Sequence, residues 1–120
     1  MKILVIGAGM MGRAIAYDLS EFSKFDKITI ADKDENAIDD AKQFLKNKEI
    51  SYETLNVENL EEVKQFFQSY DVVISAIPYF FNYDLTRIAI ETKTHFLDLG
   101  GNNDVVEKPV SYTHLRAHET

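Results

Sequence analysis

Residues 1–19 read MKILVIGAGMMGRAIAYDL, and this stretch decides the fold. Lys2–Ile6 is a short aliphatic run, as expected of a strand that is buried on both faces. Gly7, Gly9 and Gly12 follow it in the spacing G-x-G-x-x-G. Apolar residues then recur at helical spacing, which predicts an inner helix face made of Met11, Ala14, Ile15, Leu19 and Phe22. The stretch is therefore predicted to be a strand that turns through glycines into a helix.

A secretory signal is the alternative interpretation of the same residues, because a basic start precedes an apolar run and the triplet AIA. A signal needs an uninterrupted apolar stretch. Here three glycines interrupt the stretch, and Arg13 precedes the triplet. No Cys follows to indicate an oxidising compartment. We therefore favour the strand and helix, and expect a cytoplasmic protein.

The composition excludes several classes of protein. The chain has 120 residues, enough for one domain, with 45% apolar and 28% charged residues. Because there is no Cys, neither a disulfide framework nor a thiolate metal site is expected. The net charge of −7 argues against binding to nucleic acid or to an anionic membrane. No apolar run approaches the ~20 residues of a membrane span.

Each glycine has its own task if the turn binds a dinucleotide. The first permits a tight bend, the second lets a pyrophosphate approach the backbone, and the third lets the helix pack closely on the strand. The phosphates then lie at the free N–H groups and the positive dipole end of the helix. The motif gains weight here because it stands between a predicted strand and a predicted helix.

An acidic residue stands where a dinucleotide-binding unit needs one. Asp32 follows a second predicted strand, Lys27–Ala31, and lies twenty residues after Gly12. Its carboxylate would accept hydrogen bonds from the adenosine ribose and repel a 2′-phosphate. The alternative is that Asp32 only opens a turn or caps the next helix, although Asp34 is the better placed cap for that helix. Lys33 could tolerate a 2′-phosphate, so NAD is the predicted cofactor and NADP stays possible.

The rest of the chain continues to alternate strands with helices, which predicts a doubly wound parallel sheet. Asn59 and Glu62 form a capping box that opens a helix. The other predicted elements are helices from residue 35 and over 83–92, and strands over 51–57, 71–77 and 95–99. The apolar residues at helical spacing in the first of these helices are Ala37, Ala41, Phe44 and Leu45. The predicted fold is α/β of the Rossmann type, with five strands in the order 3-2-1-4-5 and an incomplete C-terminal side.

Glycine and proline mark the carboxyl ends of the predicted strands. All five glycines lie in the loops after the first and fifth strands, and Pro78 follows the fourth. Open α/β sheets bind ligands at this edge. The loop Ala76–Tyr79 is therefore where a nicotinamide ring would lie. The alternative is that Pro78 only terminates a strand.

The motifs SAIPY, at residues 75–79, and HFLDLGG, at residues 95–101, together with the opening stretch, resemble the N-terminal domain of the saccharopine dehydrogenase family. Its members include saccharopine reductases, lysine 6-dehydrogenases and carboxynorspermidine dehydrogenases. The resemblance covers about residues 1–108. It implies that Asp32, with Lys33 beside it, holds the ribose. The residues it implies for the pyrophosphate are Gly7, Gly9, Met10, Met11 and Gly12, and those for the nicotinamide side are Ser75, Ala76, Ile77 and Pro78.

The resemblance implies an oxidoreductase that transfers hydride between NAD(P) and an amino-acid C–N bond. Family members continue into a domain that binds the amino-acid substrate, so the chain is expected to be a fragment that is inactive alone. The expected partner is a small amino-acid substrate held through that domain, with a homodimer as an option. No nucleic acid and no membrane are expected as partners.

Candidate catalytic residues are few. His95 begins a strand at the edge away from the glycine turn, whereas Asp98 lies near the correct edge. Tyr79 and Asn82 could touch substrate from the loop after the fourth strand. Hydride chemistry belongs to the cofactor in this class of enzyme. We assign no catalytic residue, and expect the acid or base in the missing domain.

Two other functional classes share the opening motif. Ligand-gating domains of potassium transport systems also carry the glycine motif and the acid, and bind NAD without chemistry. The fourth and fifth predicted strands, with the stretches SAIPYFFNYDL and HFLDLGG, favour the dehydrogenases. Reductases of the extended short-chain class need a Tyr-x-x-x-Lys pair, and no tyrosine of this chain has a lysine four residues on.

The end of the chain breaks the pattern. Asp104 would cap a helix, yet Pro109 falls inside its second turn, where proline costs about 3 kcal/mol. The stretch VSYTHLRAHET that follows resembles a translated sequencing-adapter tail. We predict an NAD(P)-binding domain over 1–108 and a non-native, disordered tail over 109–120. His114 and His118 lack a third ligand, so no metal site is expected.

Overall fold

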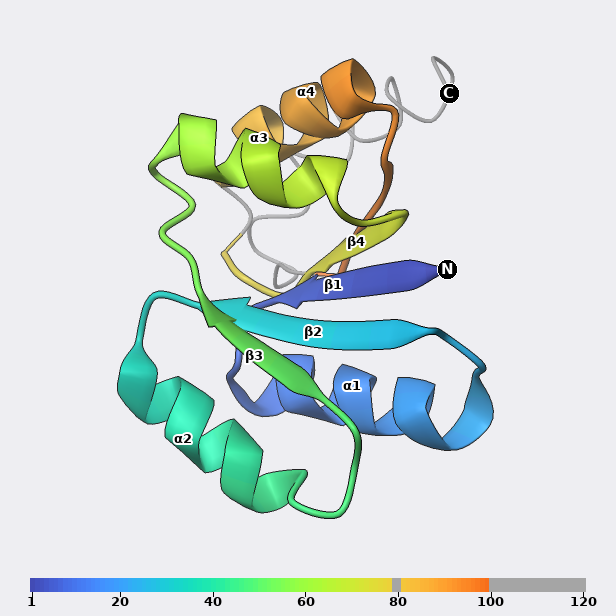
Figure 1. Cartoon of the computed structure of the whole chain (residues 1–120). Helices are drawn as coiled ribbons and strands as arrows, with labels where there is room; N and C mark the ends of the chain where they lie inside the picture. The colour runs from blue at the N-terminus through green and yellow to red at the C-terminus, as the bar shows by residue number, and fades with distance from the viewer. Residues whose placement is uncertain (79–80, 100–120) are drawn as a thin grey trace.

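Five parallel strands form one sheet in the order β3-β2-β1-β4-β5, as the sequence predicts. The computed structural model describes residues 1–78 and 81–99. Figure 1 shows β1 in the middle of the sheet, between β2 and β4. The strands are β1 (Lys2–Ile6), β2 (Lys27–Asp32), β3 (Ser51–Thr54), β4 (Val72–Ser75) and β5 (His95–Asp98).

The strand register brings three carboxyl ends together. Ile6, the last residue of β1, pairs with Ala31 of β2 on one side and with Ser75 of β4 on the other. The strand order reverses at β1, because β2 and β3 are added on one side of it and β4 and β5 on the other. This is the topological switch point, where open α/β sheets bind ligands.

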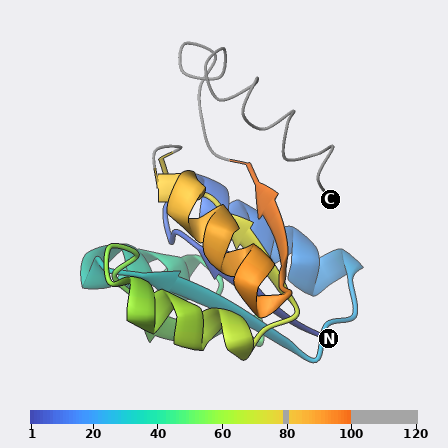
Figure 2. The same ribbon diagram turned by 90° about the horizontal axis from the view of Figure 1, so that it is seen from above.

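Four helices cover the two faces of the sheet. Helices α1 and α2 lie on one face, and α3 and α4 lie side by side on the other (Figure 1, and from above in Figure 2). Their bounds are α1 Met10–Phe22, α2 Glu35–Phe44, α3 Leu60–Gln68 and α4 Asn82–Thr92. None of these helices, within the part of the chain that the structure describes, has the length and apolar character of a membrane span.

The central strand is buried on both faces, as predicted. Ile3 and Val5 pack in the core on the side of α1 and α2, whereas Leu4 and Ile6 pack with α3 and α4. Each of the four side chains is at most 1% exposed. The side chains alternate because successive residues of a strand point to opposite faces. A rigid central strand therefore ends at the glycine turn.

The predicted helix caps are confirmed. The Asp34 side chain accepts a hydrogen bond from Asn36 N at 2.9 Å and opens α2. The Asn59 side chain accepts from Glu62 N at 3.3 Å and opens α3, whereas the Asn59 N–H donates to Asn56 O at 3.0 Å and not to the Glu62 side chain, so only half of the predicted capping box is found. Both caps satisfy an N–H group that the first helical turn leaves without a partner inside the helix.

The predicted inner faces of the first two helices are partly wrong. Met11, Ala14 and Phe22 are exposed, and α1 meets the sheet instead through Gly12 and Ala16 with Ile15 and Leu19. Small residues stand at this contact because α1 begins directly after a short turn and packs close to β1. Phe44 of α2 is also exposed; its ring lies 6.2 Å from that of Tyr17.

Three of the strands, β3, β4 and β5, end earlier than predicted. Strand β3 ends at Thr54 rather than at residue 57, and β4 ends at Ser75 rather than at residue 77. In each case the neighbouring strand ends at the same level, since Thr54 pairs with Asp32 and Ser75 pairs with Ile6. Strand β5 ends at Asp98, one residue early. The two glycines after it and the predicted tail lie outside the described residues.

Candidate functional site

The glycine turn begins with a conformation that favours glycine. Gly7 has φ +111°, in the left-handed region, and its N–H donates to Ala31 O at 2.8 Å. A Cβ at Gly7 would also lie 3.0 Å from Ala76 O and 3.1 Å from the Ile77 side chain. Any larger residue would therefore be strained and would press on the loop after β4. This accounts for the first glycine of the motif.

The other two glycines differ in what surrounds them. A Cβ at Gly12 would come within 2.7 Å of the Gly7 carbonyl carbon, which leaves no room for a side chain. A Cβ at Gly9 would meet no atom of the described residues within 4 Å. Gly12 therefore permits close packing of α1 on the turn, whereas the space in front of Gly9 is open to a ligand.

The N-terminus of α1 offers donors to that space. Gly9 is the N-cap residue and has no side chain to accept from the first turn. The first hydrogen bond of the helix joins Arg13 N to Gly9 O at 3.0 Å. The N–H groups of Met10, Met11 and Gly12 precede it and have no partner inside the helix. With the helix dipole, they make this end suitable for an anion.

Asp32, at the end of β2, hydrogen-bonds to two segments of main chain. One carboxylate oxygen accepts from Ala8 N at 2.8 Å, and the other accepts from Asp34 N at 2.9 Å. The second bond is the turn-opening role that the sequence left as an alternative. A carboxylate has about four acceptor positions, so about two remain for a ribose diol. The structure thus gives Asp32 a structural role and leaves acceptors free.

The charges around Asp32 are mostly acidic. Asp34 and Glu35 follow it closely in the chain and are exposed. The Lys33 ammonium lies 4.0 Å from a carboxylate oxygen of Glu58, and both side chains are about two-thirds exposed. An exposed ion pair of this kind is weak. It nevertheless places the Glu58 carboxylate beside Lys33, the basic residue that follows Asp32 in the chain.

The loop after β4 lies against the glycine turn. Ala76 N donates to Ile6 O at 2.8 Å, so the loop leaves the sheet directly beside Gly7. Ala76 and Ile77 are half-buried and Pro78 is exposed. The structure therefore brings the two predicted cofactor segments together at one edge of the sheet. Tyr79 lies outside the described residues.

Ser75 differs from the rest of this loop because it is fully buried. Its hydroxyl donates to the Asn82 side-chain oxygen at 2.7 Å, and Asn82 itself is only 3% exposed. The Asn82 side-chain nitrogen has no hydrogen-bond partner among the described residues. Ser75 and Asn82 therefore join the two ends of the β4–α4 loop from within. The sequence identifies both residues as candidates but does not predict the hydrogen bond between them.

The two candidates on β5 stand at opposite ends of the strand. His95 is exposed at its start, and Asp98 is half-buried at its end, where it pairs with Ser75. The positions agree with the predicted edges. Residues 1–78 and 81–99 contain no group of three metal-ligating side chains placed to hold a metal ion. His114 and His118 lie outside the described residues.

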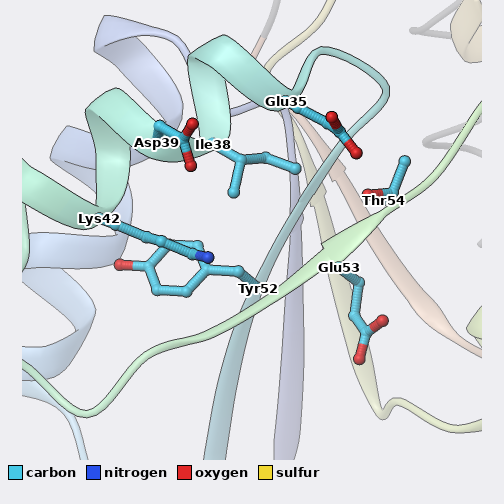
Figure 3. A pocket seen from close by; sticks show the side chains of 7 residues that line it. All are labelled: Glu35, Ile38, Asp39, Lys42, Tyr52, Glu53 and Thr54. Carbon is cyan, nitrogen blue, oxygen red and sulfur yellow. The ribbon is translucent and has the colours of Figure 1, made fainter.

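A separate cleft of about 400 Å³ lies between α2 and β3 (Figure 3). Three carboxylates, from Glu35, Asp39 and Glu53, line it together with Lys42 and other residues. The Lys42 ammonium lies 5.6 Å from the centre of the Tyr52 ring, so a cation of the chain already covers that ring. Burial raises the pKa of the Tyr52 phenol above its ordinary value. None of the predicted cofactor residues lines this cleft.

The geometry at the glycine turn fits a dinucleotide. A pyrophosphate needs open space over a glycine, N–H groups without a partner in the helix and a helix N-terminus, and within the described residues all three lie around Gly9. An acceptor for the ribose stands at Asp32, and the loop from Ala76 lies across the switch point. These three features lie at the carboxyl ends of β1, β2 and β4, so the fold itself brings them together.

Comparison with known families gives the same result. Residues 3–119 match the family described as the saccharopine dehydrogenase NADP binding domain. The chain belongs to this family. It is therefore an NAD(P)-binding domain of the saccharopine dehydrogenase type. The match includes the stretch from residue 109, whose non-native origin stays a prediction.

Solved structures share the fold. The chain superposes on apo saccharopine dehydrogenase (L-Glu forming) from Saccharomyces cerevisiae with a TM-score of 0.70 at 23% identity, covering 90% of this chain and 23% of that one. A wide-type short-chain dehydrogenase/reductase from Veillonella parvula, in complex with NADP, gives 0.63 at 11% identity, covering 81% and 46%.

Prephenate dehydrogenase from A. aeolicus, in complex with hydroxyphenyl propionate and NAD+, gives a TM-score of 0.62 at 20% identity, covering 83% of this chain and 33% of that one. Identities of this size establish a shared fold and do not define a reaction. The chain spans less than half the length of each of these three structures.

Proposed function

We propose that the chain binds the dinucleotide across the switch point, with its pyrophosphate in the open space over Gly9. The free N–H groups of Met10, Met11 and Gly12 would hold the phosphates. The observation that carries this proposal concerns residues 1–78 and 81–99, within which open space at Gly9 adjoins a helix N-terminus that has no side-chain cap. Gly7 and Gly12 would support the turn by their close packing.

The two ends of the dinucleotide would lie on either side of this turn. The adenosine ribose would hydrogen-bond to Asp32, with Lys33 beside it. The nicotinamide would lie toward Ala76, Ile77 and Pro78. The Ser75 hydroxyl is buried and engaged with Asn82, so Ser75 would act by shaping this loop rather than by touching the ring.

NAD(H) is the proposed preference, although the family description names NADP. A 2′-phosphate would meet the Asp32 carboxylate, with Asp34 and Glu35 close by in the chain. The Lys33 charge that could offset this repulsion lies 4.0 Å from Glu58. The acidic surroundings therefore support the cofactor with the smaller negative charge.

The proposed reaction is hydride transfer between the nicotinamide and the C–N bond of an amino acid. Family membership and the SAIPY and HFLDLGG stretches support this class over the potassium-transport regulators. The bound nicotinamide would supply the hydride chemistry. This chain's own residues would bind and orient the dinucleotide. The acid or base and the substrate contacts are proposed to lie beyond the described residues.

Binding and turnover test the two levels of this proposal separately. NADH fluorescence on titration with the 120-residue chain should show saturable binding that NAD+ displaces. NADH formation should then be followed with lysine, saccharopine or carboxynorspermidine, and with lactate as a control that lacks a C–N bond. We expect turnover only from the product of the complete gene and only with an amine substrate. Absence of NADH binding would overturn the first level, and turnover of lactate alone would overturn the second.

A further inference from the structure

The Asp32 carboxylate joins segments that are far apart in the sequence. One oxygen accepts from Ala8 N in the glycine turn, 24 residues earlier, and the other accepts from Asp34 N just beyond β2. The Asp32 main-chain oxygen also accepts from Leu55 N at 3.1 Å, just after β3. Because each carboxylate oxygen has a main-chain donor, the orientation of the group is set without any ligand.

The Ala8 N–H that Asp32 accepts from lies between the first two glycines of the motif. Ala8 is 1% exposed and belongs to the core on the side of α1 and α2. The preceding N–H, of Gly7, donates to Ala31 O at 2.8 Å. Two successive N–H groups of the turn therefore donate to the end of β2. A buried N–H that loses its acceptor is costly, so the turn depends on Asp32.

We propose that Asp32 is a positioning residue for the pyrophosphate as well as a ligand for the ribose. By holding Ala8 N–H it sets the path of the turn that leads into α1. The free N–H groups of the first helical turn are then placed for the phosphates before the dinucleotide arrives. Such preorganisation raises affinity because the ordering cost is not incurred on binding. This inference rests on the proposed dinucleotide site.

A ligand without ribose hydroxyls separates the two roles. ADP carries the pyrophosphate and both ribose hydroxyls. In 2′,3′-dideoxy-ADP the pyrophosphate is kept and both hydroxyls are absent. If Asp32 served only the ribose, replacing it would leave the affinity for dideoxy-ADP unchanged or improved, because a negative charge is removed near an anionic ligand. If Asp32 also positions the turn, the affinity falls for both ligands. The two roles thus predict opposite results.

The variants are Asp32→Asn and Asp32→Ala, with Asp34→Asn as the matched control. Asp34→Asn removes one negative charge close by, keeps a good N-cap residue and leaves the bond to Ala8 in place. Calorimetric titration should show dideoxy-ADP binding about tenfold weaker in Asp32→Ala and changed less than about twofold in the control, with a smaller loss in Asp32→Asn because the Asn amide oxygen can still accept from Ala8 N–H. Unchanged or tighter binding of dideoxy-ADP by Asp32→Ala would overturn the proposal.

Amide hydrogen exchange tests the turn without any ligand. In the unliganded chain the Ala8 amide should exchange at least about tenfold faster in Asp32→Ala than in the parent, while the Val5 amide in β1 stays protected and reports that the sheet is folded. An unchanged Ala8 rate with β1 protected would overturn the positioning role. If the parent bound neither ADP nor dideoxy-ADP, the proposed site would fail, and the exchange result would still decide the role of Asp32 in the turn.

Discussion

Gly12, in the first turn of α1, lies directly against Gly7, the first residue after β1. A Cβ at Gly12 would come within 2.7 Å of the Gly7 carbonyl carbon, whereas a Cβ at Gly9 would meet nothing within 4 Å in the part of the chain that the structure describes. The two positions share a motif and differ in their surroundings. Substitutions there should therefore separate folding from binding.

Gly12→Ala should destabilise the fold, because neither the helix nor the turn can move away without loss of core packing. We expect a cost of about 3 kcal/mol or more in the free energy of unfolding. Gly9 has φ −72°, which any residue can adopt, so Gly9→Ala should change stability by about 1 kcal/mol or less. Urea denaturation of the two variants beside the parent measures both values. Equal stability of the two variants would contradict the packing at Gly12.

Gly9→Val should remove dinucleotide binding while keeping the fold. The branched side chain would fill the space that the pyrophosphate is proposed to occupy, and among the described residues no atom lies within 4 Å of its Cβ. The expected result is a circular dichroism spectrum like the parent's, with NADH affinity lowered by about a hundredfold or more. Parent-like affinity would place the phosphates elsewhere.

Asp32→Ser should narrow the preference for NAD(H) over NADP(H). The substitution removes both a ribose acceptor and a charge that repels the 2′-phosphate. Since the glycine turn should suffer equally with either cofactor, the ratio of the two affinities is the diagnostic quantity. We expect this ratio to fall by about tenfold, measured by parallel titrations with NADH and NADPH. Tighter NADPH binding by the parent would make Lys33 the dominant neighbour and contradict the proposed preference.

The fold could be predicted from local patterns, because each strand, cap and glycine carries its own signal. The strand order and the caps at Asp34 and Asn59 were predicted in this way. Phe44 was wrongly predicted to lie on the inner face of its helix. Its helical spacing does not reveal that its ring packs against Tyr17 at the surface. Periodicity identifies the more apolar face of a helix, but the distance between helix and sheet decides which residues reach the core.

The candidate site shows a different limit of prediction. Asp32 had two alternative roles in the sequence, ribose ligand or turn residue, and the structure shows that the turn role leaves acceptors for the other. Ser75 and Asn82 were each placed near the cofactor, yet their mutual hydrogen bond has no signal in spacing or composition. Such a bond depends on how the loop between them folds back, which is a tertiary property.

Tyr52 should make part of the stability depend on alkaline pH. Burial raises the pKa of its phenol, so the folded chain holds the proton more tightly than the unfolded chain. This contribution is fully present below the pKa of a free tyrosine, about 10, and is lost as the pH rises through the folded value. In Tyr52→Phe, the fall in the urea midpoint between about pH 9 and about pH 11 should be smaller than in the parent. An identical fall in both proteins would exclude this contribution.

Ser75 and Asn82 should behave as a coupled pair in folding. Ser75→Ala leaves the buried Asn82 amide without its remaining partner among the described residues, and we expect a cost of about 1–3 kcal/mol in the free energy of unfolding. Asn82→Leu likewise strands the Ser75 hydroxyl. The double variant replaces both polar groups by apolar ones and should cost clearly less than the sum of the single changes, because no buried polar group is left unpaired. Urea denaturation of the four proteins gives the coupling free energy, with NADH titration in parallel. Additive costs would show that the two side chains do not act together, and the β4–α4 loop would then have to be held by other contacts.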